Sequence, residues 1–552
     1  MTDELTNRLY YGDNLNILRD YIPDGSVDLV YLDPPFNSNR DYNVIFKDES
    51  GNKSDAQLVA FEDTWHWGPD AERQYEYLTN TASNGGRVPD SVSTIVDALR
   101  HGIGTNQMMA YLTEMTVRLV ELHRVLRPTG SLYLHCDPTA SHYLKVALDA
   151  IFGPERFLSE ITWQRTATKG DAVRKWGAVH DVLLFYAKGS TYSFRPQYLS
   201  QDADYLSRYR LDDHDGRGPY RIAPLDSPNP RPNLTYEYKG FQPPAKGWRV
   251  SRDLMEQLDQ EGRLAFPTKP GGRIGRKHYL LEQEGRKATD VWTDITPLQA
   301  ASAEKLGYPT QKPLVLLERI LEASSNPGDV VLDPFCGCGT ALVAAQKLGR
   351  RWIGIDVTYL SIAVMKARLL DTLGLENVEV VGQPTEVIGA KALAEDPRDG
   401  RYQFQWWALS LVGAQPVGGQ KKKGADAGID GVIGFTDAGG KRERVIVSVK
   451  SGGVNASMIR DLKGTLEREK APLGLFITLE EPSRPMRQEA AEAGFWHSEV
   501  WNRDYPRLQI LSIADLLELD KKPDLPAFVH EPFQRAQKID LKRHDQKSLF
   551  DS

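Results

Sequence analysis

Two short stretches of the sequence place side chains where they could bind or activate another molecule. In the first, an apolar run ends in Asp33, two prolines and Phe36. The prolines remove two backbone donors and fix two φ angles, so neither a strand nor a helix continues through them. A strand-ending turn explains the prolines, but not why a carboxylate and an aromatic ring flank them. We therefore treat this stretch as a candidate site.

The second stretch is a glycine-rich turn between an apolar run and a helical pattern, and it contains Gly337 and Gly339. Glycines let the chain turn tightly and let a ligand approach the backbone, and amides at a helix start attract polar groups. The next apolar run ends in Asp356, where α/β nucleotide-binding folds hold ribose hydroxyls. A plain helix-starting turn is the alternative. The phosphate-loop fingerprints G-x-G-x-x-G and G-K-[ST] are absent, so the pattern favours ribose over phosphate.

The elements around both stretches alternate in the α/β manner. Apolar runs of strand length lie at 25–36, 130–137 and 179–189, and 107–126 has the apolar spacing of a helix. The same alternation returns at 312–357. We expect buried, parallel strands. Because the carboxyl ends of such strands face one crevice, the two stretches could lie side by side despite their distance in sequence.

Between these parts, residues 191–300 are rich in Pro, Gly, Arg and aromatic residues, which predicts irregular or short-stranded structure. The range 161–300 holds 22 Lys and Arg against 17 Asp and Glu, whereas the whole chain has a net charge of −7. A basic zone inside an acidic protein can be the footprint of a polyanion, although an excess of this size is weak evidence alone.

These motifs resemble those of the DNA amino-methyltransferases. DPFCGCGT at 333–340 is similar to the family's S-adenosylmethionine motif, DPPF at 33–36 to its catalytic motif, and PTQKPLVLLERIL at 309–321 to a further cofactor-binding segment. The catalytic motif precedes the cofactor motif, as in the β class and the type III modification subunits. The resemblance covers about residues 8–380 and implies an α/β, S-adenosylmethionine-dependent methyltransferase fold. Its open sheet would be mostly parallel, with permuted motif order and an inserted target-recognition region.

The resemblance gives the DPPF residues one joint role. An exocyclic amine is a poor nucleophile because its lone pair is delocalised, so methyl transfer requires that lone pair to be localised and aimed. The Asp33 carboxylate and the Pro34 carbonyl would accept the two amine hydrogens, and Pro34 and Pro35 would keep these acceptors rigid. Phe36 would stack on a base rotated out of the duplex.

The resemblance also implies contacts to the cofactor. Thr310 and Lys312 would lie near its methionine end, Phe335 against it, and Asp13 near its adenine. A helix cap is the alternative role for Asp13, and a solvated lysine at a helix start is the alternative for Lys312. The full set of implied cofactor-binding residues is Asp13, Thr310, Lys312, Asp333, Phe335, Gly337, Gly339 and Asp356.

The target base is indicated by the first residue of DPPF. Asp there, with an aromatic fourth residue, resembles adenine-N6 enzymes, whereas cytosine-N4 enzymes more often begin this motif with Ser. The implied function is site-specific methylation of the N6 amine of adenine in double-stranded DNA by base flipping. Cytosine-N4 methylation stays open because both amines need the same acceptors. Arg174, Lys175 and Trp176 are candidates for DNA contact, or ordinary surface residues.

A separate block at 402–519 contains a helix, a loop, an acid before one strand and a lysine at the end of the next. This arrangement resembles the PD-(D/E)xK restriction-endonuclease-like fold, also α/β. The resemblance implies that Asp430 would hold a divalent metal such as Mg²⁺ and that Lys450 would orient the attacking water.

This block departs from the nuclease pattern at Ser448, where the family has Glu or Gln. Ser is a poor metal ligand, so the cleavage centre could be weakened, rebuilt with Asp426 or Gln405, or lost. Three interpretations stay open. The chain could be a single-chain restriction-modification protein, a methyltransferase with a DNA-gripping domain, or chiefly a nuclease or DNA-binding protein whose methylase half is vestigial.

The remaining expectations concern boundaries and surroundings. No apolar run approaches the roughly 20 residues that span a bilayer, and the N-terminus resembles neither a signal nor a transit peptide, so we expect a cytoplasmic protein without a membrane partner. The three cysteines indicate neither disulfides nor zinc. Gln546–Phe550 resembles the Q-x-x-L-F peptides that dock on the bacterial sliding clamp, and a homodimer is left open. The predicted parts are 1–190 (methyltransferase catalytic part), 191–300 (target recognition), 301–384 (cofactor binding), 385–401 (linker), 402–519 (nuclease-like) and 520–552 (disordered tail).

Overall fold

The computed structural model describes most of the chain, in two compact units. One unit comprises Met1–Arg195 with Asp290–Gln546, and the other is formed by Pro196–Thr289 with the last residues. Residues 41–47, 53–62 and 204 are described by their backbone alone. The described residues are 7–35, 41–47, 53–62, 65–167, 174, 176–201, 203–269, 271–299, 302–306, 308, 310–396, 400–417, 428–437, 441–526 and 536–538.

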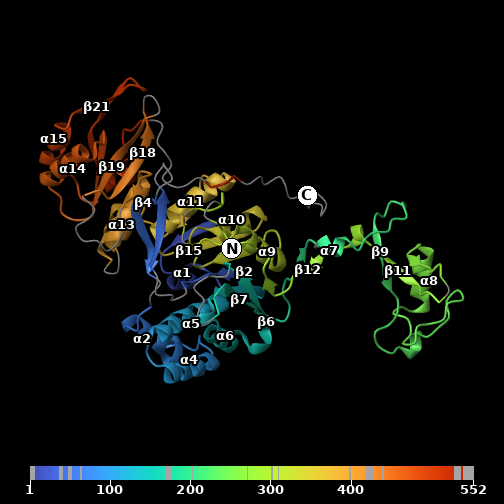
Figure 1. The fold of residues 1–552 in the computed structure, drawn as a ribbon. Coiled ribbons are helices and arrows are strands. Elements are labelled where there is room, and N and C mark those ends of the chain that lie inside the picture. The colour runs from blue at the N-terminus through green and yellow to red at the C-terminus, as the bar shows by residue number, and fades with distance from the viewer. Residues whose placement is uncertain are drawn as a thin grey trace. The chain divides into compact units, whose positions relative to one another are not determined.

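The first unit is built on a nine-stranded sheet, counted over the described residues, in the order β13-β6-β7-β5-β2-β14-β15-β1-β16 (Figure 1). β14 lies between β2 and β15 and pairs in parallel with both, with Val331 opposite Leu29. Segments some 300 residues apart are therefore adjacent, as the motif order requires. The strands are β1 (Arg8–Tyr11), β2 (Val27–Leu32), β5 (Leu126–Cys136), β6 (Phe157–Gln164), β7 (His180–Ala187), β13 (Val291–Trp292), β14 (Val330–Asp333), β15 (Arg351–Asp356) and β16 (Glu379–Val381).

One strand differs from the expected parallel arrangement. β7, predicted from the apolar run at 179–189, pairs antiparallel with both β5 and β6, whereas the other pairs in this sheet are parallel. The prediction was wrong because a strand covered on both faces shows the same continuous apolar run in either direction. The sheet as a whole is mostly parallel, as expected.

Both faces of this sheet are covered by helices (Figure 1). Successive residues of β2 project to opposite sides, so Val30 and Leu32 enter one core and Leu29 and Tyr31 the other. One core is closed by α1 (Asn14–Tyr21), α2 (Pro69–Thr79), α4 (Asp90–Ile103), α5 (Gln107–Val125) and α6 (Pro138–Phe152), and the other by α9 (Leu314–Ser324), α10 (Thr340–Lys347) and α11 (Tyr359–Leu373).

The C-terminal part of this unit has its own five-stranded sheet, β17-β18-β19-β20-β23. Phe404 and Trp407 of α13 cover one face, and α14 and α15 cover the other. The helix α12 (Val387–Glu395) lies within the range predicted as a linker. The elements are α13 (Gly400–Leu411), β17 (Gln415–Pro416), β18 (Gly431–Thr436), β19 (Arg442–Lys450), α14 (Ala456–Glu469), β20 (Leu473–Thr478), α15 (Arg484–Ala491), β21 (Phe495–Ser498), β22 (Arg503–Pro506), β23 (Leu508–Ser512) and α16 (Ile513–Leu517).

The second unit has little regular structure around a small core that includes Trp248, Met255 and Ile274. Its elements are β8 (Tyr198–Leu199), α7 (Ala203–Leu206), β9 (Tyr220–Pro224), α8 (Arg252–Gln260), β10 (Leu264–Ala265), β11 (Gly275–Tyr279) and β12 (Arg286–Lys287). The first unit also contains β3 (Asp41–Lys47), β4 (Lys53–Glu62) and α3 (Thr81–Asn84). Of the helices in the described part of the chain, none has the length and apolar character needed to cross a membrane.

Candidate active site

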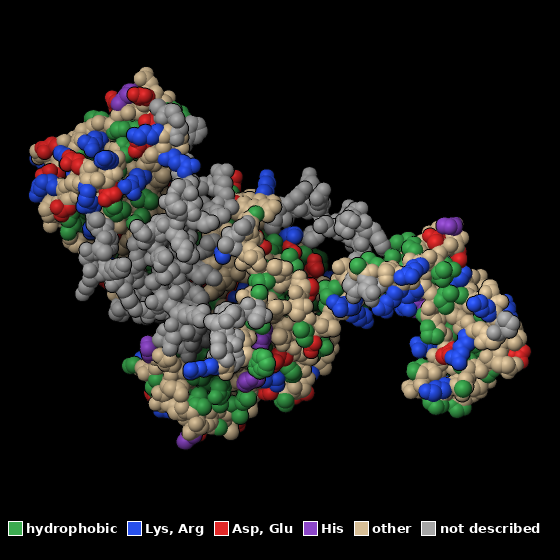
Figure 2. All heavy atoms as spheres, in the orientation of Figure 1, with side chains coloured by type: hydrophobic (Ala, Val, Ile, Leu, Met, Phe, Trp, Pro, Cys, Tyr) green, Lys and Arg blue, Asp and Glu red, His purple; other side chains and the backbone are tan. Residues whose placement is uncertain are grey.

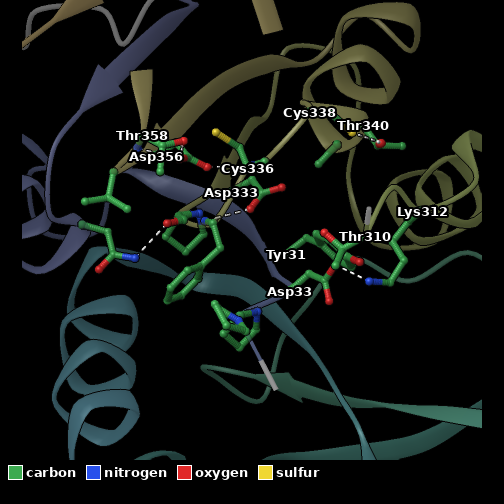
Figure 3. Close-up of a pocket in the computed structure, with 18 of the residues that line it drawn as sticks. Tyr31, Asp33, Thr310, Lys312, Asp333, Cys336, Cys338, Thr340, Asp356 and Thr358 are labelled. Carbon is green, nitrogen blue, oxygen red and sulfur yellow. Dashed lines mark hydrogen bonds and ion pairs between the residues drawn. The ribbon is translucent and has the colours of Figure 1, made fainter. Parts of the chain in front are cut away.

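A cavity of about 270 Å³ opens at the carboxyl ends of β1, β2, β14 and β15, and we call it the central cavity. Both stretches singled out in the sequence contribute to its wall. Tyr31, Asp33, Thr310 and Lys312 lie at one end, and Asp356 and Thr358 at the other (Figure 3). The predicted site residues that line it are Asp13, Asp33, Pro34, Pro35, Thr310, Lys312, Asp333, Phe335, Gly337 and Asp356.

Two predicted residues of this site remain to be placed. Gly339 lies one step further along, as the residue that precedes α10. Phe36 lies outside the described residues, so its predicted stacking role stays a prediction. Asn14, Arg118 and Trp65 also line the cavity and were not predicted.

Asp33 directly follows β2 and forms an ion pair with Lys312, which precedes α9. The side chains are 15% and 11% exposed, so the pair is largely shielded from water. Lys312 is therefore not a solvated lysine at a helix start. Its ammonium donates to the carboxylate oxygen that the resemblance assigns to the target amine.

The glycine-rich turn needs its two glycines for different reasons. Gly337 has φ +51° and Gly339 φ +75°, in the left-handed region that side chains rarely adopt. A Cβ at Gly337 would lie 3.2 Å from the Tyr308 ring, and a Cβ at Gly339 would lie 2.9 Å from Met365 Cγ. The first glycine keeps the cavity wall open, and the second lets α10 start against α11.

Asp356 lies at the end of β15 with its carboxylate held by backbone donors. The Gly337 N–H donates to Oδ2 at 3.0 Å, and the Thr358 N–H donates to Oδ1 at 2.9 Å. Burial raises the pKa of Asp356 above its ordinary value, and these hydrogen bonds reduce the rise. The carboxylate is thus fixed in place at a strand tip, where ribose hydroxyls bind in nucleotide-binding folds.

Asp333 is buried between the two ends of the cavity. Burial raises its pKa well above the ordinary range; the Phe335 N–H, which donates to Oδ1 at 3.1 Å, opposes this, while the charge of Asp33 adds to it. A neutral, protonated Asp333 would reduce the repulsion among the carboxylates that face the cavity.

Asp13 caps a helix and lines the cavity, whereas its role near the cofactor's adenine stays a prediction. Its carboxylate accepts from the Leu15 N–H at 2.8 Å and so caps α1, and it also lines the cavity. Arg118 of α5 donates to Asp13 at 3.2 Å and to Asn14 at 2.7 Å. Asn14 in turn donates to the Pro334 carbonyl at 2.8 Å, which ties α1 to the glycine-rich turn. A buried arginine within an apolar helix was the signal that could have identified this link.

The candidates for DNA contact are only partly described. The Trp176 side chain is 97% exposed, and Arg174 is also exposed, whereas Lys175 lies outside the described residues. Their role in DNA contact stays a prediction.

In the C-terminal part, the predicted acid and lysine lie together. Asp430 Oδ2 accepts from Lys450 Nζ at 3.1 Å, from the Val449 N–H at 2.7 Å and from the Ser448 hydroxyl at 3.1 Å. Throughout the described residues there is no group of three or more His, Cys, Asp or Glu that could hold a metal ion. Gln405 belongs to α13, and Asp426 lies outside the described residues.

Comparison with known proteins places these motifs in a family. The model of a family described as DNA methylase, N6_N4_Mtase, matches residues 27–364, which contain the central cavity's catalytic and glycine-rich motifs. The chain belongs to the DNA methylase family. Its expected methyltransferase fold, with a mostly parallel sheet and permuted motif order, is confirmed. A second family, described as NACHT-associated inactive Restriction Endonuclease 1, matches residues 413–518 and bears out the nuclease-like fold expected there.

Curated relatives of this DNA methylase carry the names of DNA methyltransferases or of a restriction-modification subunit. It is 35% identical over 249 residues to the type II methyltransferase M.EcaI of Enterobacter cloacae, a match over 45% of this chain and 54% of the relative. It is 23% identical over 354 residues to the Mod subunit of the type III enzyme StyLTI of Salmonella typhimurium, over 62% and 50% of the two chains. The DNA adenine methyltransferase YhdJ of Escherichia coli is 27% identical over 240 residues, 43% of this chain and 60% of YhdJ. The chain spans about half the length of the curated relatives it matches.

Among solved structures, a Thermus thermophilus protein complexed with S-adenosyl-L-methionine is 17% identical. The match covers 69% of this chain and 100% of the other, with a TM-score of 0.32, which is too low to add to the argument.

Proposed function

We propose that the protein transfers a methyl group from S-adenosylmethionine to the N6 amine of adenine in double-stranded DNA, with the target base rotated out of the duplex. One observation carries this proposal. Asp33 and Pro34 line the same cavity as Gly337 and Asp356, although some 300 residues separate them in sequence.

The residues at the Asp356 end fit the nucleoside part of S-adenosylmethionine. The fixed carboxylate of Asp356 suits ribose hydroxyls, and the missing Cβ at Gly337 leaves the wall free for a flat ring system. At the other end, the Lys312 ammonium and the Thr310 hydroxyl suit the carboxylate of the methionine part of S-adenosylmethionine. Bound in this cavity, S-adenosylmethionine would supply a methyl group on a sulfonium.

The residues at the Asp33 end would hold and activate the target amine. The Asp33 carboxylate accepts one amine hydrogen and the Pro34 carbonyl the other, which localises the nitrogen lone pair and aims it. Pro34 and Pro35 have no N–H groups that could compete for these acceptors. Lys312 already contacts the Asp33 carboxylate. The target amine must therefore displace the Lys312 ammonium from this carboxylate or bind the carboxylate together with it.

Adenine is favoured over cytosine by Asp33 as the first motif residue, and the similarity to a DNA adenine methyltransferase supports this choice. Cytosine N4 would need the same two acceptors. The two functions are therefore separated by the product and not by the geometry.

We propose that the unit Pro196–Thr289 recognises the DNA. Exposed basic side chains gather along the segment that carries α7 and β12 (Figure 2). Arg208, Arg210, Arg286 and Lys287 are among the exposed residues there. Such side chains neutralise phosphates and set the register of a protein on a duplex.

The first prediction concerns Asp33. The purified full-length protein should transfer labelled methyl groups to duplex DNA, and digestion to nucleosides should give N6-methyldeoxyadenosine. Asp33→Ala should lower the single-turnover rate by about 100-fold or more, since it removes one of the two acceptors. Asp70→Ala, which removes an exposed carboxylate outside the cavity, is the control. N4-methyldeoxycytidine as the product would establish cytosine-N4 methylation instead. Full activity of Asp33→Ala would refute the proposed mechanism, because Asp33 would then not be needed to accept an amine hydrogen.

We infer that the nuclease-like part does not cleave DNA. The inference is supported by Ser448 in the place of an acidic ligand and by the engagement of Asp430 with Lys450. The second prediction is that neither Mg²⁺ nor Mn²⁺ supports cleavage of unmethylated plasmid by the full-length protein. Metal-dependent cleavage that disappears in Asp430→Ala would contradict this and restore the single-chain restriction-modification interpretation.

Sliding-clamp docking, a homodimer and a cytoplasmic location remain predictions. The segment Gln546–Phe550 lies outside the described residues.

A further inference from the structure

A row of polar side chains crosses the sheet beside the central cavity. Tyr31 Oη lies 3.0 Å from His135 Nδ1, and His135 Nε2 lies 3.2 Å from Asp181 Oδ2. Asp181 Oδ1 forms an ion pair with Arg165 Nε at 2.8 Å. The first three residues come from the adjacent strands β2, β5 and β7 and are buried, whereas the Arg165 side chain is 39% exposed. The row thus runs from the cavity wall to the protein surface.

The surroundings of this row are apolar. The Trp163 ring packs edge-on against the His135 imidazole with centroids 5.8 Å apart, and Tyr133 stacks on Phe185 next to it. A carboxylate and an imidazole are costly to bury, and well-packed apolar side chains often serve stability equally well. A purely structural role therefore explains these residues poorly.

The row ends beside the catalytic acid. Tyr31 precedes Asp33 by two residues, and both residues line the central cavity. Both lie at the Lys312 end of the cavity (Figure 3).

The charge of Asp181 determines the direction of the hydrogen bonds. Burial alone would raise the pKa of Asp181, but the hydrogen bond and the electrostatic interaction with His135, followed by the charges of Lys312 and Arg165, hold it below its ordinary value. The ionised carboxylate accepts from His135 Nε2–H, which leaves Nδ1 as an acceptor. The Tyr31 hydroxyl is then the donor to His135.

Tyr31 itself stays a neutral hydroxyl. Burial raises its pKa well above the ordinary range, and the charges of Asp33, Asp333 and Asp181 raise it further. It can therefore give its proton to His135 only if it receives another at the same time.

We propose that Tyr31, His135 and Asp181 form a relay that removes the proton which the target amine loses on methylation. This proposal rests on the proposed function and goes beyond it. When the amine nitrogen bonds to the methyl carbon, the electron pair of the sulfur–carbon bond stays on sulfur and one N–H proton leaves the nitrogen. Asp33 takes up that proton and passes it to the Tyr31 oxygen, while the Tyr31 O–H proton moves to His135 Nδ1. Asp181 stabilises the resulting imidazolium. After the product leaves, the proton on His135 Nδ1 returns to the Tyr31 oxygen while the Tyr31 O–H proton passes through Asp33 to water in the opened cavity, which restores the starting state.

The third prediction tests the relay through its pH dependence. Single-turnover methyl transfer is measured between about pH 5.5 and about pH 9 for the full-length protein and its variants. The wild-type rate should fall on the acid side, since a relay that already holds an extra proton cannot take up another. Tyr31→Phe should lower the rate at neutral pH by about 10-fold or more and should abolish this acid limb. Asp181→Asn, which keeps the shape of the side chain, should lower the rate and displace the limb.

Tyr133→Phe is the matched control. Tyr133 lies opposite Tyr31 on the neighbouring strand, on the same face, but its hydroxyl bonds to Ser324 Oγ at 2.7 Å and it does not line the cavity. It should keep the wild-type rate and profile. Base flipping, followed by the fluorescence of 2-aminopurine at the target position, should stay within about 2-fold of wild type in Tyr31→Phe, because the relay acts after the base has been bound.

Three results would overturn the relay. They are a wild-type rate in Tyr31→Phe, a slow Tyr31→Phe whose acid limb is unchanged, and a loss of the flipping signal, which would assign Tyr31 to base binding. If Tyr31→Phe fails to fold, Asp181→Asn with an unchanged profile has the same force. Absence of any methylated base with the wild-type protein would instead reject the proposed function.

Discussion

The contact between Asp33 and Lys312 joins the two halves of the central cavity at the level of single side chains. An acid from the N-terminal motif and a base from the segment before α9 form one partly buried ion pair. A pair of this kind is worth little against an apolar replacement, but loss of one partner leaves the other charge uncompensated. The pair therefore holds the Asp33 carboxylate in place before any ligand arrives.

The fourth prediction is a double-mutant cycle on this pair. Lys312→Met should destabilise the protein by about 3 kcal/mol, because it strands the Asp33 carboxylate. Asp33→Asn in the same chain should recover part of that loss, with a coupling of about 1 kcal/mol or more. Thermal unfolding midpoints of the four proteins measure both effects. Strictly additive losses would show that the two side chains do not support one another.

The residues of the site differ in how far the sequence reveals them. Asp33, Gly337 and Asp356 each follow an apolar run and interrupt a local pattern, so their positions at strand ends could be predicted. Arg118 interrupts an apolar helix, which signals a buried partner but does not say which one. Its contact to Asn14 and the contact of Asn14 to Pro334 join positions 104 and 320 residues apart, so the partners could not be predicted from local periodicity.

At the scale of elements, the Asp356 end of the central cavity depends on where α10 begins. Gly339, in the left-handed region, turns the chain from the cavity wall into the helix, and Met365 of α11 fills the space beside it. The helix can begin there only because no Cβ occupies that space. The position of α10 thus follows from one residue without a side chain.

The fifth prediction compares two glycines with similar positive φ angles, where an alanine would be strained to a similar extent. Gly339→Ala should destabilise the protein by about 1–2 kcal/mol through its positive φ and further through the close contact with Met365. Gly374→Ala, at φ +71° with no atom within 4 Å of the added Cβ, should show the strain alone. Urea unfolding measures the loss of stability in each variant. Calorimetric titration with S-adenosylmethionine measures whether each variant still binds the proposed cofactor. Equal losses for both variants would show that the contact is readily relieved.

Element directions were harder to predict than element positions. The helix expected at 107–126 is α5, Gln107–Val125, and the apolar runs are strands, yet β7 is antiparallel. Apolar pattern reports burial, whereas direction depends on how the chain crosses from β6 back to β5. The order of the strands likewise depends on the insertion of β14 beside β2, which was not predicted, although the shared crevice of an open parallel sheet led us to expect the two stretches side by side.

At the scale of the whole molecule, the nuclease-like part is not loosely attached to the methylase. Phe404 and Trp407 of α13 share one buried core with Leu360 and Val364 of α11. The Tyr359 N–H also donates to Gln403 Oε1 at 3.3 Å. The helix α11 begins three residues after Asp356, so this core lies directly behind the Asp356 end of the cavity.

A gene fragment that stops before residue 400 would remove the apolar side chains of α13 that pack behind that wall. Recombination that exchanges the nuclease-like part for an unrelated domain would have to supply a helix of matching shape. Otherwise the Asp356 end of the central cavity would lose its packing partner. Descent should therefore keep the two halves as partners, even in lineages where the second has lost its original chemistry.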